Sequence, residues 1–155
     1  MHTRFSPDAA PGAYEAMLGL ERYLKSSSIE ERLLHLIKLR ASQINGCAYC
    51  LDMHWKDLEA IGETPLRMYS LDAWRECPYY SDRERAALAW TEAVTLVTNG
   101  HVSDDVYEEA RAAFSDKELV DLTLAVATIN AWNRLSIAAR AEPGRYQPAA
   151  LAKSK

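Results

Sequence analysis

The strongest constraint on the fold is a Ser-x-x-Glu pattern that recurs three times, at Ser28/Glu31, Ser81/Glu84 and Ser115/Glu118. In such a capping box the serine side chain accepts a hydrogen bond from a backbone amide at a helix start, and the glutamate reaches back to the serine amide. An apolar run with helical period follows each box. The pattern therefore predicts three helix starts, and Thr64-Pro65 and Ser103 predict two more.

Strand patterns are nearly absent, because no stretch between turns alternates apolar and polar residues over several positions. We therefore expect an all-α protein, a compact helical domain of six to seven helices. One domain is expected over 12–142, between a flexible N-terminal segment (1–11) and a flexible C-terminal tail (143–155). The helices are expected at about 12–26, 29–44, 47–61, 65–75, 82–98, 104–113 and 116–140.

The size and charge of the chain exclude several classes of protein. Its 155 residues suit one domain with a core, and its net charge of −4 argues against a nucleic-acid partner. It has no run of 18 apolar residues that would span a membrane and no secretory signal at its start, so a cytoplasmic location is expected. The helix expected over 116–140 is apolar around much of its circumference, which favours burial in the core or by a second subunit. We expect a homo-oligomer.

The stretch NGCAYCLDMH (45–54) places Cys47, Cys50 and His54 close together. On a helix beginning near Cys47 the three side chains share one face, and Cys50 and His54 lie one turn apart. The chain has three cysteines, a count that does not suit a disulfide-stapled secreted domain. In a reducing compartment a close cysteine pair is more often catalytic or metal-binding than structural.

Two effects would lower a thiol pKa in this stretch, and they favour different sulfurs. The helix N-terminus favours a thiolate most strongly at Cys47. A protonated His54 favours a thiolate most strongly at Cys50. In either case one thiolate can attack a substrate and the other thiol can resolve the product as a disulfide.

Two other interpretations of the motif remain open. The cysteines can be small buried hydrophobic residues, and His54 a core histidine. A structural zinc site needs four ligands, which Cys47, Cys50 and His54 supply only with Cys77 or His35. A thioredoxin-like site is disfavoured because the chain lacks the strands of its βαβ unit.

The sequence LIKLRASQINGCAYCLDMHWKDL (36–58) resembles the core of the carboxymuconolactone decarboxylase/alkylhydroperoxidase D family. ERAALAWTEAV (84–94) and INAWNRL (129–135) extend this resemblance to about 12–140. The resemblance implies an all-α fold, trimers or hexamers, and a thiol peroxidase that reduces hydroperoxides without a cofactor or metal. By position, Cys50 would be the peroxidatic cysteine, Cys47 its resolving partner and His54 part of the proton relay. A dithiol reductant, or a lipoylated or peroxiredoxin-type partner protein, would restore the enzyme.

One position departs from the family pattern. Where alkylhydroperoxidase members usually carry a glutamate twelve residues before the first cysteine, this chain has His35. An imidazole can pass a proton but cannot supply the missing negative charge. Glu92 is the candidate replacement, with a solvent-facing helix acid as its alternative. His35 itself is a candidate site residue or a histidine without a catalytic role.

Two further functions remain open from the sequence. A muconolactone-type decarboxylase is the other branch of the family, but its chemistry does not need two thiols. A non-catalytic redox-responsive or metal-binding helical module is the third possibility. Asn130, Asn133 and Arg134 lie in an apolar helix, so interhelical or intersubunit hydrogen bonds are expected there in preference to a direct active-site role.

Overall fold

The computed structural model describes residues 2–6 and 9–148, and every regular element within them is helical. This confirms the all-α prediction. The helix expected over 65–75 is divided at Ser70 into a short α-helix and a 3₁₀-helix. The elements are α1 (Pro11–Lys25), α2 (Glu31–Asn45), α3 (Ala48–Ala60), α4 (Pro65–Tyr69), η2 (Leu71–Glu76), α5 (Asp82–Thr95), α6 (Asp104–Ala113) and α7 (Asp116–Ala139).

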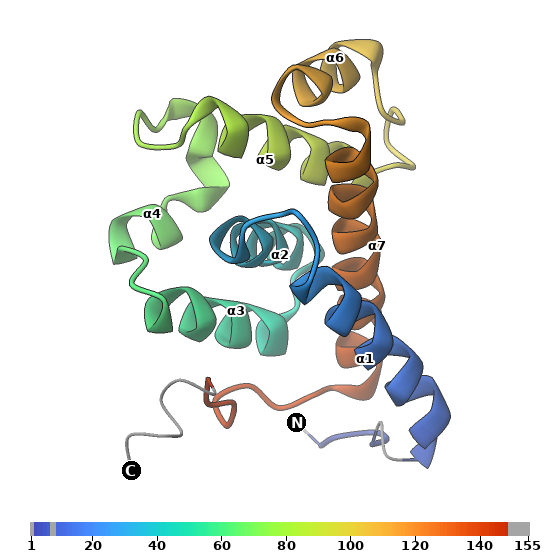
Figure 1. Cartoon of the computed structure of the whole chain (residues 1–155). Coiled ribbons are helices and arrows are strands. Elements are labelled where there is room, and N and C mark those ends of the chain that lie inside the picture. The colour runs from blue at the N-terminus through green and yellow to red at the C-terminus, as the bar shows by residue number, and fades with distance from the viewer. Residues whose placement is uncertain (1, 7–8, 149–155) are drawn as a thin grey trace.

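Helix α2 forms the centre of the fold. Figure 1 shows it end-on, with α3, α5 and α7 around it, and it packs against all three. Its side chains Leu36, Ile37 and Leu39 are almost completely buried. Apolar residues occupy several sides of this helix, and a helix of that kind is stable only when other helices surround it.

The capping-box prediction is confirmed at two of its three sites. Ser81 with Glu84 begins α5 and Ser115 with Glu118 begins α7, each with both reciprocal hydrogen bonds. The prediction is wrong for Ser28, because α2 begins at Glu31 after Glu30. Ser28 instead donates to the buried carboxylate of Asp121 (3.1 Å). A buried carboxylate is costly without hydrogen-bond donors, so this bond forms in place of the helix cap.

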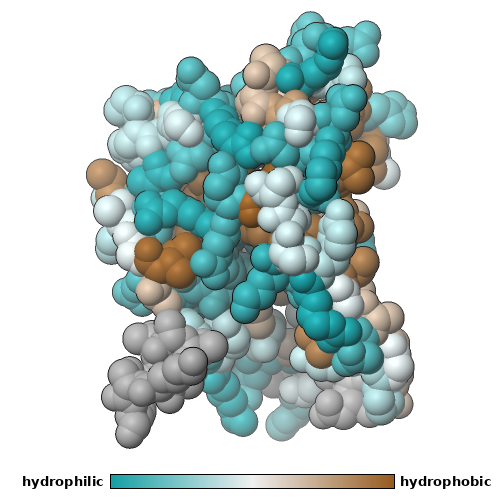
Figure 2. All heavy atoms as spheres, viewed as in Figure 1, coloured by the Kyte–Doolittle hydropathy of each residue, from teal (hydrophilic) through white to brown (hydrophobic). Residues whose placement is uncertain are grey.

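The surface seen in Figure 2 is mainly hydrophilic, with separate apolar patches. Exposed apolar side chains of α7 include Val120, Leu135 and Ile137. Among the described residues, none of the helices is both long enough and apolar enough to cross a membrane. Of the segments expected to be flexible, residues 1, 7–8 and 149–155 lie outside the described part of the chain.

Candidate active site

Cys47 and Cys50 form a disulfide at the start of α3, with their Cα atoms 5.3 Å apart. Gly46 ends α2 with φ +68°, a left-handed conformation that turns the chain sharply into α3. Cys47 is the N-cap of α3, and its sulfur accepts a hydrogen bond from the Cys50 amide (3.4 Å). Both cysteines are buried. Of the described cysteines, only Cys77 remains a free thiol.

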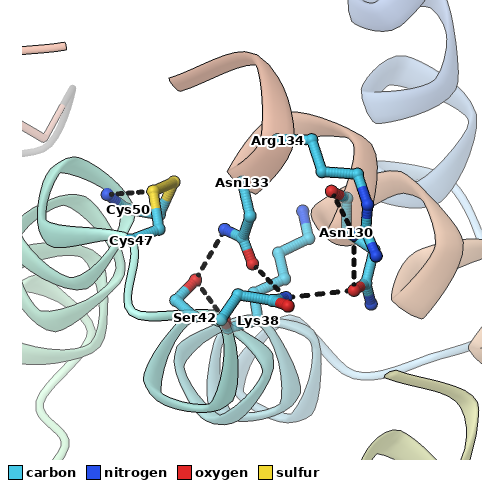
Figure 3. Close-up of a disulfide and its surroundings, with 8 residues drawn as sticks. Lys38, Ser42, Cys47, Cys50, Asn130, Asn133 and Arg134 are labelled. Atoms are coloured by element: carbon cyan, nitrogen blue, oxygen red, sulfur yellow. Dashed lines mark hydrogen bonds between the residues drawn. A yellow bond between two sulfur atoms is a disulfide. The ribbon is translucent and has the colours of Figure 1, made fainter. Parts of the chain in front are cut away.

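A buried polar network holds the turn that precedes the disulfide. Asn45 donates to the side-chain oxygens of Asn130 (3.0 Å) and Asn133 (2.9 Å), which join α2 to α7. Asn133 in turn donates to Ser42 Oγ (3.1 Å), and Figure 3 shows this bond beside the two cysteines. The expectation of interhelical hydrogen bonds in α7 is therefore confirmed for Asn130 and Asn133, whereas Arg134 donates to Asn130 of its own helix. The network restrains the point where Cys47 begins α3.

His54 lies one turn after Cys50 on α3 and faces a second histidine. Its ring centroid lies 5.8 Å from that of His35 on α2. Asp57, three residues further along α3, has its Oδ2 atom 3.7 Å from Nδ1 of His54 and 3.6 Å from Nδ1 of His35. The structure thus brings three of the predicted site residues, Cys47, Cys50 and His54, into one short segment, and places His35 against it.

The charges in this cluster follow from burial. Burial lowers the pKa of His54, although the Asp57 carboxylate partly opposes the effect. Burial, and then the neighbouring His54, lowers the pKa of His35 to about 4. Burial alone would raise the pKa of Asp57, but its interactions with His54 and Tyr146 hold that pKa below its ordinary value. At pH 7 the cluster therefore contains two neutral imidazoles and one carboxylate.

The C-terminal segment packs onto α3 beside this cluster. The Tyr146 hydroxyl donates to Asp57 Oδ1 (2.6 Å), and the Gly144 amide donates to Asp52 Oδ2 (3.0 Å). Lys56 donates to the carbonyl oxygens of Gly144 and Tyr146. Residues 144–146 thus hold the Asp57 carboxylate in place from outside the helical bundle.

Glu92 does not take the position expected for it. Among the described residues it forms no hydrogen bond or ion pair with His54. Its carboxylate accepts hydrogen bonds from Arg40 (2.8 Å), from Trp74 (2.9 Å) and from Arg75. These bonds join α2, η2 and α5. The partly buried Glu92 therefore holds helices together. The carboxylate beside His54 is Asp57.

Sequence reasoning missed Asp57, Tyr146 and Lys38. Asp57 was detectable, because a residue three positions after His54 lies on the same helix face. Lys38 is buried on α2 and pairs with Glu21 (2.6 Å), and an interior lysine is not expected from composition. Tyr146 lies far away in sequence and outside any helix, so no local pattern pointed to it.

His35 makes stability depend on pH in a defined window. In the unfolded chain its pKa is about 6.5, and in the folded protein it is about 4. The unfolded state therefore binds more protons between these values. The contribution of His35 to the free energy of unfolding should be fully present above pH 6.5, and the free energy should fall by about 2–3 kcal/mol as the pH decreases to 4. Urea unfolding in the presence of a chelator, repeated across this pH range, measures the slope, that is, how the free energy of unfolding changes with pH.

Two variants test the assignment of this slope. His35→Gln should remove most of the loss attributed to His35, while His101→Asn, at an exposed histidine, should keep the wild-type slope. Equal slopes for wild type and His35→Gln would contradict the prediction.

The site belongs to the class of helical dithiol sites, in which a Cys-x-x-Cys pair lies at a helix start and a histidine follows one turn later. Residues 11–93 match the model of the carboxymuconolactone decarboxylase family. The chain is 45% identical over 131 residues to the uncharacterized protein YdfG of Bacillus subtilis, covering 84% of this chain and 89% of YdfG. The chain belongs to the carboxymuconolactone decarboxylase family.

Two solved structures extend the comparison. A protein of unknown function from Agrobacterium tumefaciens, proposed to be the antioxidant defence protein AhpD, has a TM-score of 0.90 and 43% identity. The match covers 94% of this chain and 100% of that chain. A single-residue variant of the debrominase Bmp8, in complex with 2,3,4-tribromopyrrole, has a TM-score of 0.78 and 18% identity, covering 96% of this chain and 79% of that chain. The second likeness shows the fold alone.

Proposed function

We propose that this protein is a thiol peroxidase that reduces hydroperoxides through a Cys47–Cys50 dithiol/disulfide cycle. The observation that carries the proposal is the disulfide at the start of α3, with neutral His54 one turn further on. The pair is a two-electron store, and the imidazole is a base near it. The resemblance to alkylhydroperoxidase D supports Cys50 as the attacking residue.

The first half of the cycle oxidises Cys50. His54 accepts the thiol proton, and the resulting thiolate attacks the terminal oxygen of the hydroperoxide. The O–O bond breaks, Cys50 becomes a sulfenic acid, and the alkoxide takes the proton back from His54 to leave as an alcohol. Asp57, held by Tyr146, stabilises the transient imidazolium.

The second half returns the protein to the dithiol. The Cys47 thiol attacks the sulfenic sulfur, which releases water and forms the disulfide. A dithiol reductant then exchanges with the disulfide and leaves oxidised. A small dithiol or a lipoylated or peroxiredoxin-type protein is proposed for this role. We also propose a homo-oligomer, because α7 leaves apolar side chains exposed.

A brief peroxide pulse tests the proposal directly. Reduced protein is mixed with a small excess of alkyl hydroperoxide, quenched with an alkylating reagent and analysed by mass spectrometry. Cys47 and Cys50 should become linked, while Cys77, which has no partner cysteine nearby, stays alkylated as an internal control. Oxidation of Cys77 as fast as the pair, or no linkage, would contradict the proposed function.

A further inference from the structure

Three potential ligand atoms on α2 and α3 lie close together without forming hydrogen bonds to one another. Nδ1 of His35 and Nδ1 of His54 each approach Oδ2 of Asp57, and the three residues offer one ligand atom each within 4.8 Å of one another. Both Nδ1 atoms are buried, and neither has a hydrogen-bond partner among the described residues. The His54 side chain is only 7% exposed. Buried imidazole nitrogens without partners are uncommon and indicate that another species belongs between them.

The separations indicate what that species is. Direct hydrogen bonds would need about 2.7–3.2 Å, whereas the histidine nitrogens lie 3.6 and 3.7 Å from Asp57 Oδ2. An ion about 2.1 Å from Asp57 Oδ2 and from a histidine nitrogen would see that pair at an angle of about 120°, near the angles of a four-coordinate site. To bind both histidines it would hold their nitrogens, which lie within 4.8 Å of each other, no more than about 4.2 Å apart. A water about 2.8 Å from each atom would have a nitrogen–water–oxygen angle of about 80°. This angle is narrow for two hydrogen bonds at one water.

We propose that His35, His54 and Asp57 form a binding site for a divalent transition-metal ion of the zinc class. Two imidazoles and one carboxylate are a ligand set that such ions accept, with a fourth position left for water. The site shares His54 with the dithiol centre but uses neither sulfur. It therefore differs from the zinc site considered from the sequence, which depended on both cysteines.

The surroundings of the three ligands fit this role. The Tyr146 hydroxyl binds the other oxygen of the Asp57 carboxylate (2.6 Å), which orients Oδ2 toward the histidines. His35 and Asp57 also line a cavity of about 510 Å³, which gives an ion and its water a route from solvent. The nearby Lys38 ammonium would repel a cation, but Glu21 neutralises it at 2.6 Å.

Metal binding would regulate the dithiol centre, a consequence that rests on the proposed function. A neutral imidazole has one N–H group and one lone pair. If Nδ1 of His54 gives its lone pair to the metal, the other ring nitrogen carries the proton. His54 then has no lone pair left to accept the proton of the Cys50 thiol. The metal-loaded protein should reduce peroxide more slowly than the metal-free protein.

Calorimetric titration with zinc chloride tests the binding site. The protein is oxidised at Cys47–Cys50 and carries Cys77→Ser, so that no thiol competes for zinc. One equivalent of zinc should bind, and His35→Ala, His35→Gln and Asp57→Asn should each weaken binding at least about 10-fold. His101→Asn, at an exposed histidine, should bind as wild type does. Cobalt(II) should give the visible absorption of a four-coordinate site in wild type and lose it in Asp57→Asn.

The outcomes separate this proposal from the proposed function. Absence of zinc binding by wild type, or equal binding by wild type and both His35 variants, would overturn the metal site whatever the peroxidase assay shows. Peroxide reduction is measured separately, in chelator, and its absence would leave the zinc titration intact. Saturating zinc should slow peroxide reduction at the concentration that half-fills the site, and an unchanged rate would overturn the regulatory role.

Discussion

Replacing Cys50 by serine should lower peroxide consumption at least about 10³-fold. A serine hydroxyl is not ionised near neutral pH and forms no sulfenic acid. Without the Cys50 sulfur, the peroxide has no group in the site to accept two electrons from. Peroxide consumption is followed in the presence of excess dithiothreitol. Equal rates in Cys50→Ser and wild type would remove Cys50 from the mechanism.

Cys47→Ser separates the two roles within the pair. Serine is a good N-cap, so α3 should keep its start at this position. If Cys47 only resolves the intermediate, Cys47→Ser should still be oxidised once at Cys50. A sulfenic-acid reagent such as dimedone should then label Cys50. Labelling of Cys47 in the Cys50→Ser variant, with none at Cys50 in Cys47→Ser, would reverse the two assignments.

Cys77→Ser is the matched control for both substitutions. Cys77 is a free thiol whose sulfur lies 3.4 Å from the carbonyl oxygen of Ala73. It is partly buried but outside the Cys47–Cys50 pair, and serine is a small replacement of similar shape, so turnover should stay within a factor of about two. A loss as large as that of Cys50→Ser would mean that a different thiol supports the reaction.

The helices could be predicted because their starts are encoded locally. Ser81 and Ser115 each meet their glutamate three residues later, and no distant residue is needed to form either capping box. The same pattern failed at Ser28, where a distant buried carboxylate, Asp121, recruited the serine. Local chemistry predicts a helix start when no tertiary partner competes for the same side chain.

The site was only partly predictable for a related reason. Helical spacing placed Cys50 and His54 one turn apart, which needs knowledge of one helix only. The carboxylate partner of His54 lies on the same helix and was overlooked, because Glu92 was the expected replacement for the family glutamate. How His35 of α2 and the C-terminal segment pack against α3 could not be read from one helix. In the structure that carboxylate belongs to Asp57, and Tyr146 from the C-terminal segment holds it. Contacts between distant segments have no spacing signature in one sequence.

The fold by itself does not select the reaction. The debrominase Bmp8 shares this architecture at a TM-score of 0.78. What favours redox chemistry here is the pair of sulfurs at a helix start, which a decarboxylation would not use. The position of Cys47 depends in turn on the asparagine network that joins α2 to α7.

Asn133→Leu should lower the free energy of unfolding by about 2–4 kcal/mol. Asn133 is fully buried, and its amide donates to Ser42 Oγ and accepts from Asn45. Leucine has the same branched shape and number of heavy atoms, so no cavity forms, but both hydrogen bonds are lost and Asn45 keeps only one of its two partners. Urea unfolding of the oxidised protein measures the change. Asn99→Leu, at an exposed turn, should stay within about 0.5 kcal/mol of wild type.

A double-mutant cycle with Asn45→Ala shows whether the loss belongs to the network. If the Asn45–Asn133 bond holds α2 to α7, the two substitutions should couple by about 0.5–3 kcal/mol, because the second removes a bond that the first has already broken. The same variants should also make the Cys47–Cys50 disulfide easier to reduce, since the turn at Gly46 loses its anchor to α7. Strict additivity, with an unchanged disulfide equilibrium against glutathione, would show that the asparagines stabilise the core without positioning Cys47.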